Sequence, residues 1–168
     1  MTIFRCMLVL AALVFGLQAQ SSDSSQSSIK KTLLVYDDCD AKSQPYIEFF
    51  RNEFGKTGIA FDELSLKKNG KKVPADYEVI LIYSRVVAFN MASPVRTWLK
   101  SLKTLFNKKV FVFVTANRWF EKTNMQQIVK LVSDRGGEVV DAVSTATGKM
   151  STEQKKESVA NQVAKIKR

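Results

Sequence analysis

The most chemically distinctive side chains of this sequence lie in one short segment. Asp37, Asp38 and Asp40 directly follow an apolar run that ends at Tyr36, and they precede a helical pattern. A turn from a strand into a helix is a common phosphate site in α/β proteins, because the free amides of the helix N-terminus point towards it. Three carboxylates at such a turn repel a phosphate. The segment therefore needs another explanation.

Metal chemistry is one explanation that the sequence disfavours. Asp38 and Asp40, with Ser84 as a phosphate contact, resemble the magnesium site of haloacid dehalogenase phosphohydrolases. That family's following Gly/Thr is missing, and Asp134 and Asp141 are isolated rather than a second acidic pair. A response-regulator receiver is also disfavoured, because Ser84 rather than an aspartate ends the third apolar run and no lysine ends the fifth.

Histidine and cysteine narrow the possible chemistry further. The sequence contains no histidine, which excludes histidine-based catalytic triads and histidine metal ligands. Of its two cysteines, Cys6 lies in the apolar N-terminal run and Cys39 has no intramolecular partner once that run is removed. We expect Cys39 to be a small, partly buried side chain, the alternative being a reactive or dimer-forming thiol.

The elements that position these residues can be read from periodicity. Four patterns with apolar residues at i, i+3 or i+4 predict helices around 46–54, 95–106, 125–132 and 159–166. Short apolar runs predict five strands, at 31–37, 59–66, 77–84, 109–115 and 137–143. Buried strands that alternate with helices imply a parallel sheet with right-handed crossovers. Because only residues 67–76 join the second and third strands, the helix of that crossover should be reduced or missing.

Boundary residues support these helices. Ser93 before Pro94 suits an N-cap and first-turn position, and Ser151 with Gln154 matches a capping box. Gly58 and Gly136 suit the ends of the first and third helices.

One segment carries a family resemblance. Asp76 to Thr115 contains an Asp-Tyr pair, an apolar strand, a "PVR" helix start and a "KKV" strand that ends in threonine, and it resembles the corresponding third of flavodoxin-like proteins. The resemblance implies a three-layer α/β domain with a five-stranded parallel sheet in the order 2-1-3-4-5. It also implies flavin mononucleotide (FMN) at the carboxyl ends of strands one and three, and electron transfer or flavin-dependent oxidoreduction.

The phosphate loop departs from this family. The family has a Thr-Gly-x-Thr core, and an ungapped alignment on Tyr36 places Asp40 at the glycine. Two unit charges ~4 Å apart repel by about 4 kcal/mol at an effective dielectric of 20, or roughly a thousandfold in affinity. Lys42 and Ser43 would meet the phosphate if FMN bound, but we predict that normal phosphate binding is lost.

The flavin-ring loops depart from the family as well. The segment "SRVVAFN" resembles the family's Thr-Pro-Val-aromatic-Ala loop, with Arg85 at the proline and Val87 at the stacking aromatic. Trp119 and Phe120, in the loop after the fourth strand, could cover a ring; alternatively they cap the sheet edge or form an exposed patch. The resemblance assigns the remaining ring contacts to Ser84, Ala88 and Phe89.

Arg85 suggests a role for the aspartates. It ends the third strand, which neighbours the first strand in the expected sheet, so we predict that its guanidinium pairs with Asp37, Asp38 or Asp40. Such a pair would fill the place of the cofactor's charge. The alternative is a solvated acidic turn in which Asp40 or Ser43 caps the following helix.

The N-terminus indicates export. Arg5 precedes an apolar run from Cys6 to Leu17, which is too short for the ~20 residues of a membrane span, and Ala19 is placed for cleavage. We therefore predict a signal peptide at 1–19, a flexible Ser/Gln-rich leader at 20–31 and one domain at 32–168, with no membrane span after cleavage. The protein would be periplasmic or secreted; the alternative is an uncleaved anchor.

The formal net charge of +10 suggests a partner. The expected topology brings nine basic residues to the sheet edge opposite the aspartates: Lys30, Lys31, Lys56, Lys72, Lys108, Lys109, Lys165, Lys167 and Arg168. This basic pole could attract an anionic surface or an acidic protein, whereas export makes nucleic acid an unexpected partner. The alternative is a soluble basic protein whose lysines flank apolar strands.

Together these features predict an exported flavodoxin-like protein that has diverged from FMN-dependent electron carriers and reductases. The alternative is a non-enzymatic binding or envelope-associated protein that keeps the fold as a scaffold.

Overall fold

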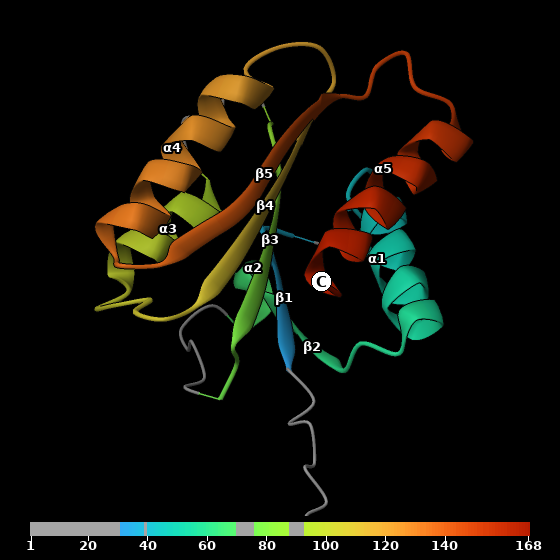
Figure 1. Ribbon diagram of the computed structural model, residues 1–168. Helices are drawn as coiled ribbons and strands as arrows, with labels where there is room; N and C mark the ends of the chain where they lie inside the picture. The colour runs from blue at the N-terminus through green and yellow to red at the C-terminus, as the bar shows by residue number, and fades with distance from the viewer. Residues whose placement is uncertain (1–30, 39, 70–75, 88–92) are drawn as a thin grey trace, which may run out of the picture.

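The computed structural model describes residues 31–38, 40–69, 76–87 and 93–168. They form a parallel sheet of five strands with helices on both faces (Figure 1). The strand order is β2-β1-β3-β4-β5, as the sequence predicts. The strands are β1 (Thr32–Tyr36), β2 (Phe61–Ser65), β3 (Val79–Arg85), β4 (Lys109–Ala116) and β5 (Glu138–Ala146).

The helices divide between the two faces of the sheet. Helices α1 (Gln44–Thr57) and α5 (Thr152–Ile166) lie side by side on one face, and α3 (Pro94–Ser101) and α4 (Glu121–Asp134) lie on the other (Figure 1). Between β2 and β3 the only helix is α2 (Leu66–Asn69), a single turn. The predicted three-layer architecture with a reduced second crossover is therefore confirmed.

Alternation along the central strands builds two cores. In β1, Leu33 and Val35 pack under α3 and α4, whereas Leu34 and Tyr36 pack under α1 and α5. The α1/α5 side is aromatic. There Phe50 of α1 meets Phe113 of β4 edge to face, with 5.4 Å between ring centroids. The aromatic spacing of the first helix is thus explained by packing against the sheet.

The predicted boundaries hold at four helix ends. Ser93 accepts the amide of Arg96 at 3.3 Å, and Ser151 and Gln154 form the reciprocal capping box. Gly58 and Gly136 have φ of 69° and 76°, in the left-handed region that favours glycine.

Several predictions lie outside the described residues. They are the signal peptide at 1–19, the leader up to residue 30, Cys39, and the ring contacts Ala88 and Phe89. In the part of the chain that is described, no helix is long and apolar enough to cross a membrane. Export stays a prediction.

The basic pole is partly neutralised by acidic neighbours. Lys31 pairs with Asp62 at 2.7 Å, and Lys165 pairs with Asp141 at 2.8 Å. Lys56 lies 2.6 Å from Glu53, one turn earlier in α1. The predicted lysines therefore carry less free charge than the sequence suggests, because acidic residues near the same edge face them. Docking on an anionic surface stays a prediction.

Alanine substitutions at two glycines should have opposite effects on stability. A Cβ at Gly148 would lie 2.4 Å from the backbone oxygen of Asn117, so Gly148→Ala should lower the free energy of unfolding by about 1–3 kcal/mol. A Cβ at Gly55, inside α1, meets nothing within 4 Å, so Gly55→Ala should raise it by about 0.5–1 kcal/mol. Urea denaturation of both variants measures the difference; equal effects would contradict the close approach at Gly148.

Candidate functional site

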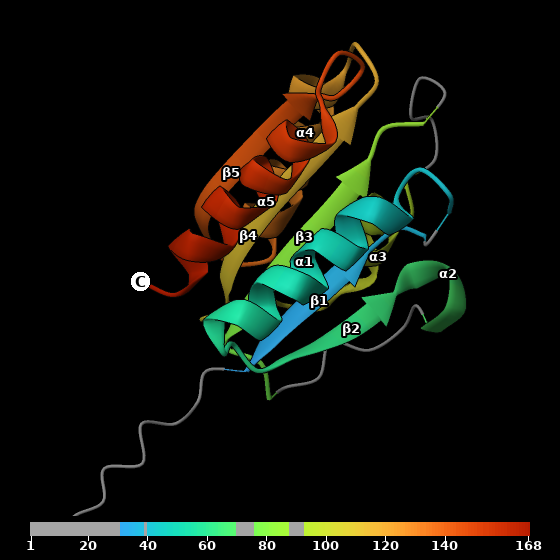
Figure 2. The same ribbon diagram turned by 90° about the vertical axis from the view of Figure 1, so that its right-hand side faces the viewer.

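The predicted site lies where the strands end. Figure 2 shows the carboxyl ends of β1, β3 and β4 at the same edge as the N-terminal ends of α1 and α5. The loop from Asp37 to Ser43 joins β1 to α1 at this edge. In parallel α/β sheets, ligands bind outside the carboxyl ends of the strands, close to the point where the strand order reverses. Here that point lies between β1 and β3.

Asp40 occupies the anion-binding groups of its own loop. Its Oδ1 accepts the amide of Ser43 at 2.7 Å and that of Lys42 at 3.1 Å. Its backbone oxygen accepts the amide of Gln44, the first residue of α1, at 2.8 Å. The carboxylate of Asp40 thus takes the amides that would otherwise face an anion at the start of this helix.

Arg85 completes this arrangement. Its Nη2 donates to Oδ2 of Asp40, and its Nε donates to Oγ of Ser43 at 3.1 Å. The prediction that Arg85 pairs with one of the aspartates is confirmed. The alternative of a helix cap is wrong for Ser43, which stands at the N-cap position but makes no capping bond and accepts from Arg85 instead. Asp40 closes the turn before α1, because the amides that its side chain accepts precede the helix.

The electrostatic balance favours a charged Asp40. Partial burial alone would raise its pKa, but the Ser43 amide and hydroxyl and the Arg85 guanidinium together hold the pKa below its ordinary value. The side chain of Arg85 is only 18% exposed, so its charge is largely withdrawn from water and directed at the loop. The pair is an internal anion and its counter-ion.

Asp37 has a different role, which the sequence analysis missed. Oδ2 accepts the hydroxyl of Ser84 at 2.6 Å, and Oδ1 accepts the amide of Val95 at 2.8 Å. Asp37 thereby ties the end of β1 to the end of β3 and to the first turn of α3. A signal was present, because the parallel register that pairs Tyr36 with Tyr83 brings the next residues, Asp37 and Ser84, together. Ser84 is buried in this bond rather than turned towards a ligand.

Asp38 pairs with a third partner. Its Oδ2 lies 2.7 Å from Nζ of Lys67, in the short helix α2. The aspartates therefore do not converge on one point. Among the described residues, no group of three histidine, cysteine, aspartate or glutamate side chains could hold a metal ion.

The predicted ring contacts are exposed. Trp119 is 71% exposed and Phe120 48% exposed, in the loop between β4 and α4. Val87, just beyond the end of β3, is 51% exposed. Because β3 and β4 are neighbours, these three side chains follow adjacent strand ends. The arrangement fits an exposed patch, one of the two expected possibilities, and contact with a ring stays a prediction.

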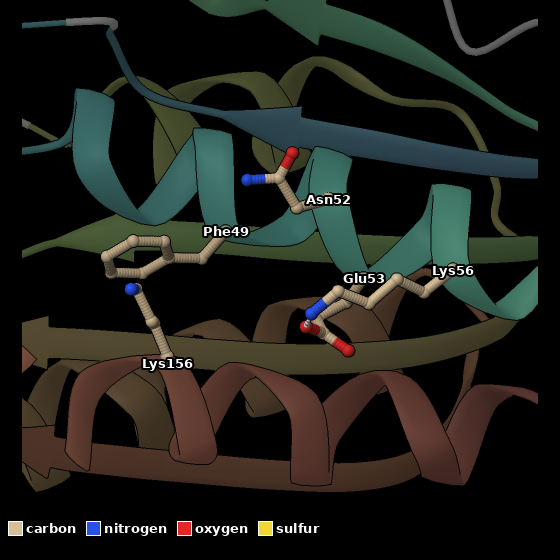
Figure 3. A pocket seen from close by; sticks show the side chains of 5 residues that line it. All are labelled: Phe49, Asn52, Glu53, Lys56 and Lys156. Carbon is tan, nitrogen blue, oxygen red and sulfur yellow. Dashed lines mark hydrogen bonds and ion pairs between the residues drawn. The ribbon is translucent and has the colours of Figure 1, made fainter. Parts of the chain in front are cut away.

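Two pockets border α1 and α5. The larger, about 420 Å³, lies at the carboxyl edge, and its lining includes Lys42, Arg85 and Lys155. The smaller, about 280 Å³, lies between the helices, where Lys156 sits 5.7 Å from the ring of Phe49 and Lys56 pairs with Glu53 (Figure 3). Only the larger pocket touches the predicted site.

Comparisons with known proteins agree with the topology. No protein-family sequence profile matches the chain, and no curated protein sequence matches it. Among solved structures, oxidised flavodoxin 2 from Bacillus cereus aligns with a TM-score of 0.62 and 15% identity, covering 82% of this chain and 98% of its own. The fold is flavodoxin-like.

Two further solved structures support the same fold. An oxidoreductase from Corynebacterium diphtheriae aligns with a TM-score of 0.59 and 12% identity, covering 83% of this chain and 96% of its own. A flavodoxin from the domain Archaea aligns with a TM-score of 0.52 and 15% identity, covering 82% and 99%. At these identities the likeness establishes the fold and leaves the ligand to be argued from the residues.

The loop does not fit the phosphate group of FMN. The amides of Lys42 and Ser43 are already bound to the Asp40 carboxylate, and the Ser43 hydroxyl is bound to Arg85. The predicted repulsion of about 4 kcal/mol at an effective dielectric of 20 needs correction, because Arg85 offsets the charge of Asp40. The obstacle in this flavodoxin-like loop is occupancy of its donors more than net charge.

The raised pKa of Asp37 predicts a pH-dependent free energy of unfolding. Burial raises its pKa above the ordinary 3.8, in spite of its bonds from Ser84 and Val95. A raised pKa means that the contribution of Asp37 to stability is fully present below pH ~3.8 and is lost as the pH rises through the folded-state pKa. The free energy of unfolding of the wild type, relative to that of Asp37→Asn, should therefore fall between pH 3 and pH 7.

Denaturant titrations of both proteins across this range measure that difference. The asparagine keeps an acceptor for Val95 and a polar partner for Ser84, so the comparison isolates the charge. A difference that is constant, or that grows in favour of the wild type with rising pH, would contradict the buried environment of Asp37.

Proposed function

We propose that this chain is an exported flavodoxin-like protein that has diverged from FMN-dependent electron carriers and reductases and no longer holds a flavin by its phosphate. The observation that carries the proposal is the insertion of Arg85 into the loop between β1 and α1, where it bridges Asp40 and Ser43. The family relation is supported by the fold and by the motif likeness between Asp76 and Thr115.

The backbone amides of the loop before α1 are not free to bind a phosphate. A phosphate at a helix N-terminus depends on backbone amides that have no other partner. Here two such amides donate to the side chain of Asp40 at 2.7 and 3.1 Å. An incoming phosphate would have to displace this carboxylate from donors within its own loop. A tethered anion has the advantage, since it loses no translational freedom when it binds.

The groups that a phosphate would displace are a second obstacle to its binding. Moving Asp40 aside would also separate it from Arg85, which is mostly buried between the loop and β3. A buried charge that loses its partner is costly, so displacement is opposed from both sides of the pair. We infer that the loop is closed to a phosphate dianion in its resting state.

Apolar side chains are exposed at the same edge of the sheet. Trp119, Phe120 and Val87 present apolar surface after the ends of β4 and β3, at the edge of the sheet where the closed loop also lies. Such a surface suits a planar ring that carries no phosphate, which would preserve a role in electron transfer or reduction. It equally suits a protein partner, and this observation favours the second candidate function, a binding or envelope-associated scaffold.

Flavin titration tests the proposal. Purified protein that starts at Gln20 and carries Lys155→Gln, a change outside this loop, should bind FMN no more tightly than riboflavin, because the phosphate finds no free donor in the loop. Quenching of flavin fluorescence measures both affinities. FMN binding a hundredfold tighter than riboflavin would contradict the proposal, whereas equal absence of binding would favour the scaffold function.

A matched pair of variants sharpens the test. Asp40→Gly frees the amides of Lys42 and Ser43, so the affinity for FMN should rise about tenfold or more while that for riboflavin stays the same. Asp38→Asn removes a charge from the same loop without opening it, since Asp38 pairs with Lys67. An equal rise in both variants would show that net charge, rather than occupied donors, excludes the phosphate.

A further inference from the structure

The larger of the two pockets borders Arg85 of the Arg85–Asp40 pair. It has a volume of about 420 Å³, within the ~300–1,000 Å³ that small-molecule sites usually occupy. Its walls come from the loop between β1 and α1, the start of α1, the ends of β3 and β4, the loop between β5 and α5, and the first turn of α5. The loop between β5 and α5 gives it a wall that the predicted flavin contacts do not share.

The charge of this pocket is strongly positive. Lys42, Arg85 and Lys155 line it, and no carboxylate is among its lining residues. Arg85 is balanced by Asp40 just outside the lining. Neither Lys42 nor Lys155 forms an ion pair or a side-chain hydrogen bond with any other residue in the described part of the chain. Two ammonium groups are thus available to one ligand.

Tyr46 adds an unused hydrogen-bond donor to the wall. Its side chain lines the pocket and the residue is only 4% exposed, yet its buried hydroxyl has no hydrogen-bond partner among the described residues. Burial raises the pKa of Tyr46 to about 12, so the hydroxyl keeps its proton at neutral pH. Thr147 interacts with this hydroxyl and lowers its pKa, but the contact falls short of hydrogen-bond geometry. A buried donor without a partner is unusual in a folded protein and points to an occupant.

The wall formed by Thr147 and Gly148 is held in place by backbone hydrogen bonds. The amide of Thr147 donates to Ala116 at 2.7 Å, and that of Gly148 donates to Asn117 at 2.8 Å. The hydroxyl of Thr147 also donates to Ala116, at 3.0 Å, which leaves its oxygen free to accept. This wall is therefore fixed before any ligand arrives, which lowers the entropic cost of binding.

Helix geometry adds to the attraction for an anion. Helices α1 and α5, of 14 and 15 residues, both begin at this edge of the sheet (Figure 2). The N-terminal end of each helix carries a partial positive charge. The end of α5 reinforces the lysines, whereas the amides before α1 already face the Asp40 carboxylate. The apolar side chains of Ala41 and Pro45 provide a surface for the uncharged part of a ligand.

We propose that this pocket binds a phosphorylated small molecule, with the phosphate between Lys42 and Lys155 and one oxygen accepting from the Tyr46 hydroxyl. A tetrahedral dianion can use both ammonium groups and a hydroxyl donor at once, which a single carboxylate does less well. The site shares Lys42 with the loop that the resemblance assigns to phosphate, but it uses the Lys42 ammonium group rather than the backbone amides that Asp40 occupies.

Glycerol 1-phosphate and glycerol form a matched pair of probes. Titrated at constant ionic strength into ¹⁵N-labelled protein that starts at Gln20, glycerol 1-phosphate should shift the amides of Lys42, Thr147 and Gly148 and saturate. Glycerol should leave them unchanged. Equal responses to the two probes, or shifts confined to the loop after β3, would overturn the proposal.

Variants separate the pocket from general basicity. Lys42→Gln and Lys155→Gln should each weaken binding about fivefold or more, by loss of one charge-assisted contact. Lys156→Gln is the control, since Lys156 is the next residue of α5 but faces Phe49 in the groove between the helices (Figure 3). An equal loss in Lys155→Gln and Lys156→Gln would show attraction to overall charge and overturn the pocket.

Tyr46→Phe tests the hydroxyl without disturbing the fold. Because the hydroxyl has no partner, its removal should leave the thermal midpoint unchanged or raised while binding weakens severalfold. A lowered midpoint with unchanged binding would overturn the role of Tyr46. Vesicles of phosphatidylglycerol distinguish the source of the phosphate: binding to vesicles with no response to soluble glycerol 1-phosphate would replace the pocket by a surface for lipid.

Discussion

The contact between Asp40 and Arg85 determines what the carboxyl edge of this sheet can do. It places a negative charge on the free amides at the start of α1 and covers that charge with a guanidinium from the neighbouring strand. An anion-binding loop is thereby filled by its own side chain. The fold is flavodoxin-like, but the loop amides that could meet a phosphate are occupied, and the proposed function rests on that.

The rest of the edge is organised around the same strand pair. Asp37 fixes the ends of β1 and β3 against the first turn of α3, so the two strands that hold Asp40 and Arg85 cannot drift apart. Beneath them, the aromatic core under α1 supports the loop from the other face. At the same edge of the sheet, the exposed aromatic residues Trp119 and Phe120 follow β4, and the lysine-lined pocket borders Arg85.

Much of this architecture follows from local sequence. Buried strands of continuous apolar residues, helices with a 3.6-residue period and residues such as Ser151 and Gly58 have short-range causes, so they predict the elements. The sheet order was predicted from the resemblance to flavodoxin-like proteins. Pairing of Arg85 with one of the aspartates could also be predicted, because the expected topology makes β1 and β3 neighbours. The hydrogen-bond partners of each aspartate could not be predicted from the sequence, since they depend on side-chain positions fixed by tertiary packing.

The lysine-lined pocket could not be predicted from the sequence either. Lys42 and Lys155 lie far apart in sequence, and neither belongs to a recognisable motif; the packing of α5 beside α1 brings them to one cavity. The sequence analysis placed Lys42 near a phosphate, but on the loop that Asp40 now occupies. Tyr46 opens the helical pattern predicted at 46–54 and is buried, but the pattern could not show that its hydroxyl lacks a partner.

A double-mutant cycle tests the central interaction most directly. The free energies of unfolding of the wild type, Asp40→Asn, Arg85→Gln and the double variant give the coupling between the two side chains. Asp40 is 39% exposed, so solvent screening reduces the coupling, yet the charge-assisted contact from the largely buried Arg85 to Asp40 should keep it above about 1 kcal/mol. A coupling of about 0.3 kcal/mol or less would show that the pair does not hold the loop closed.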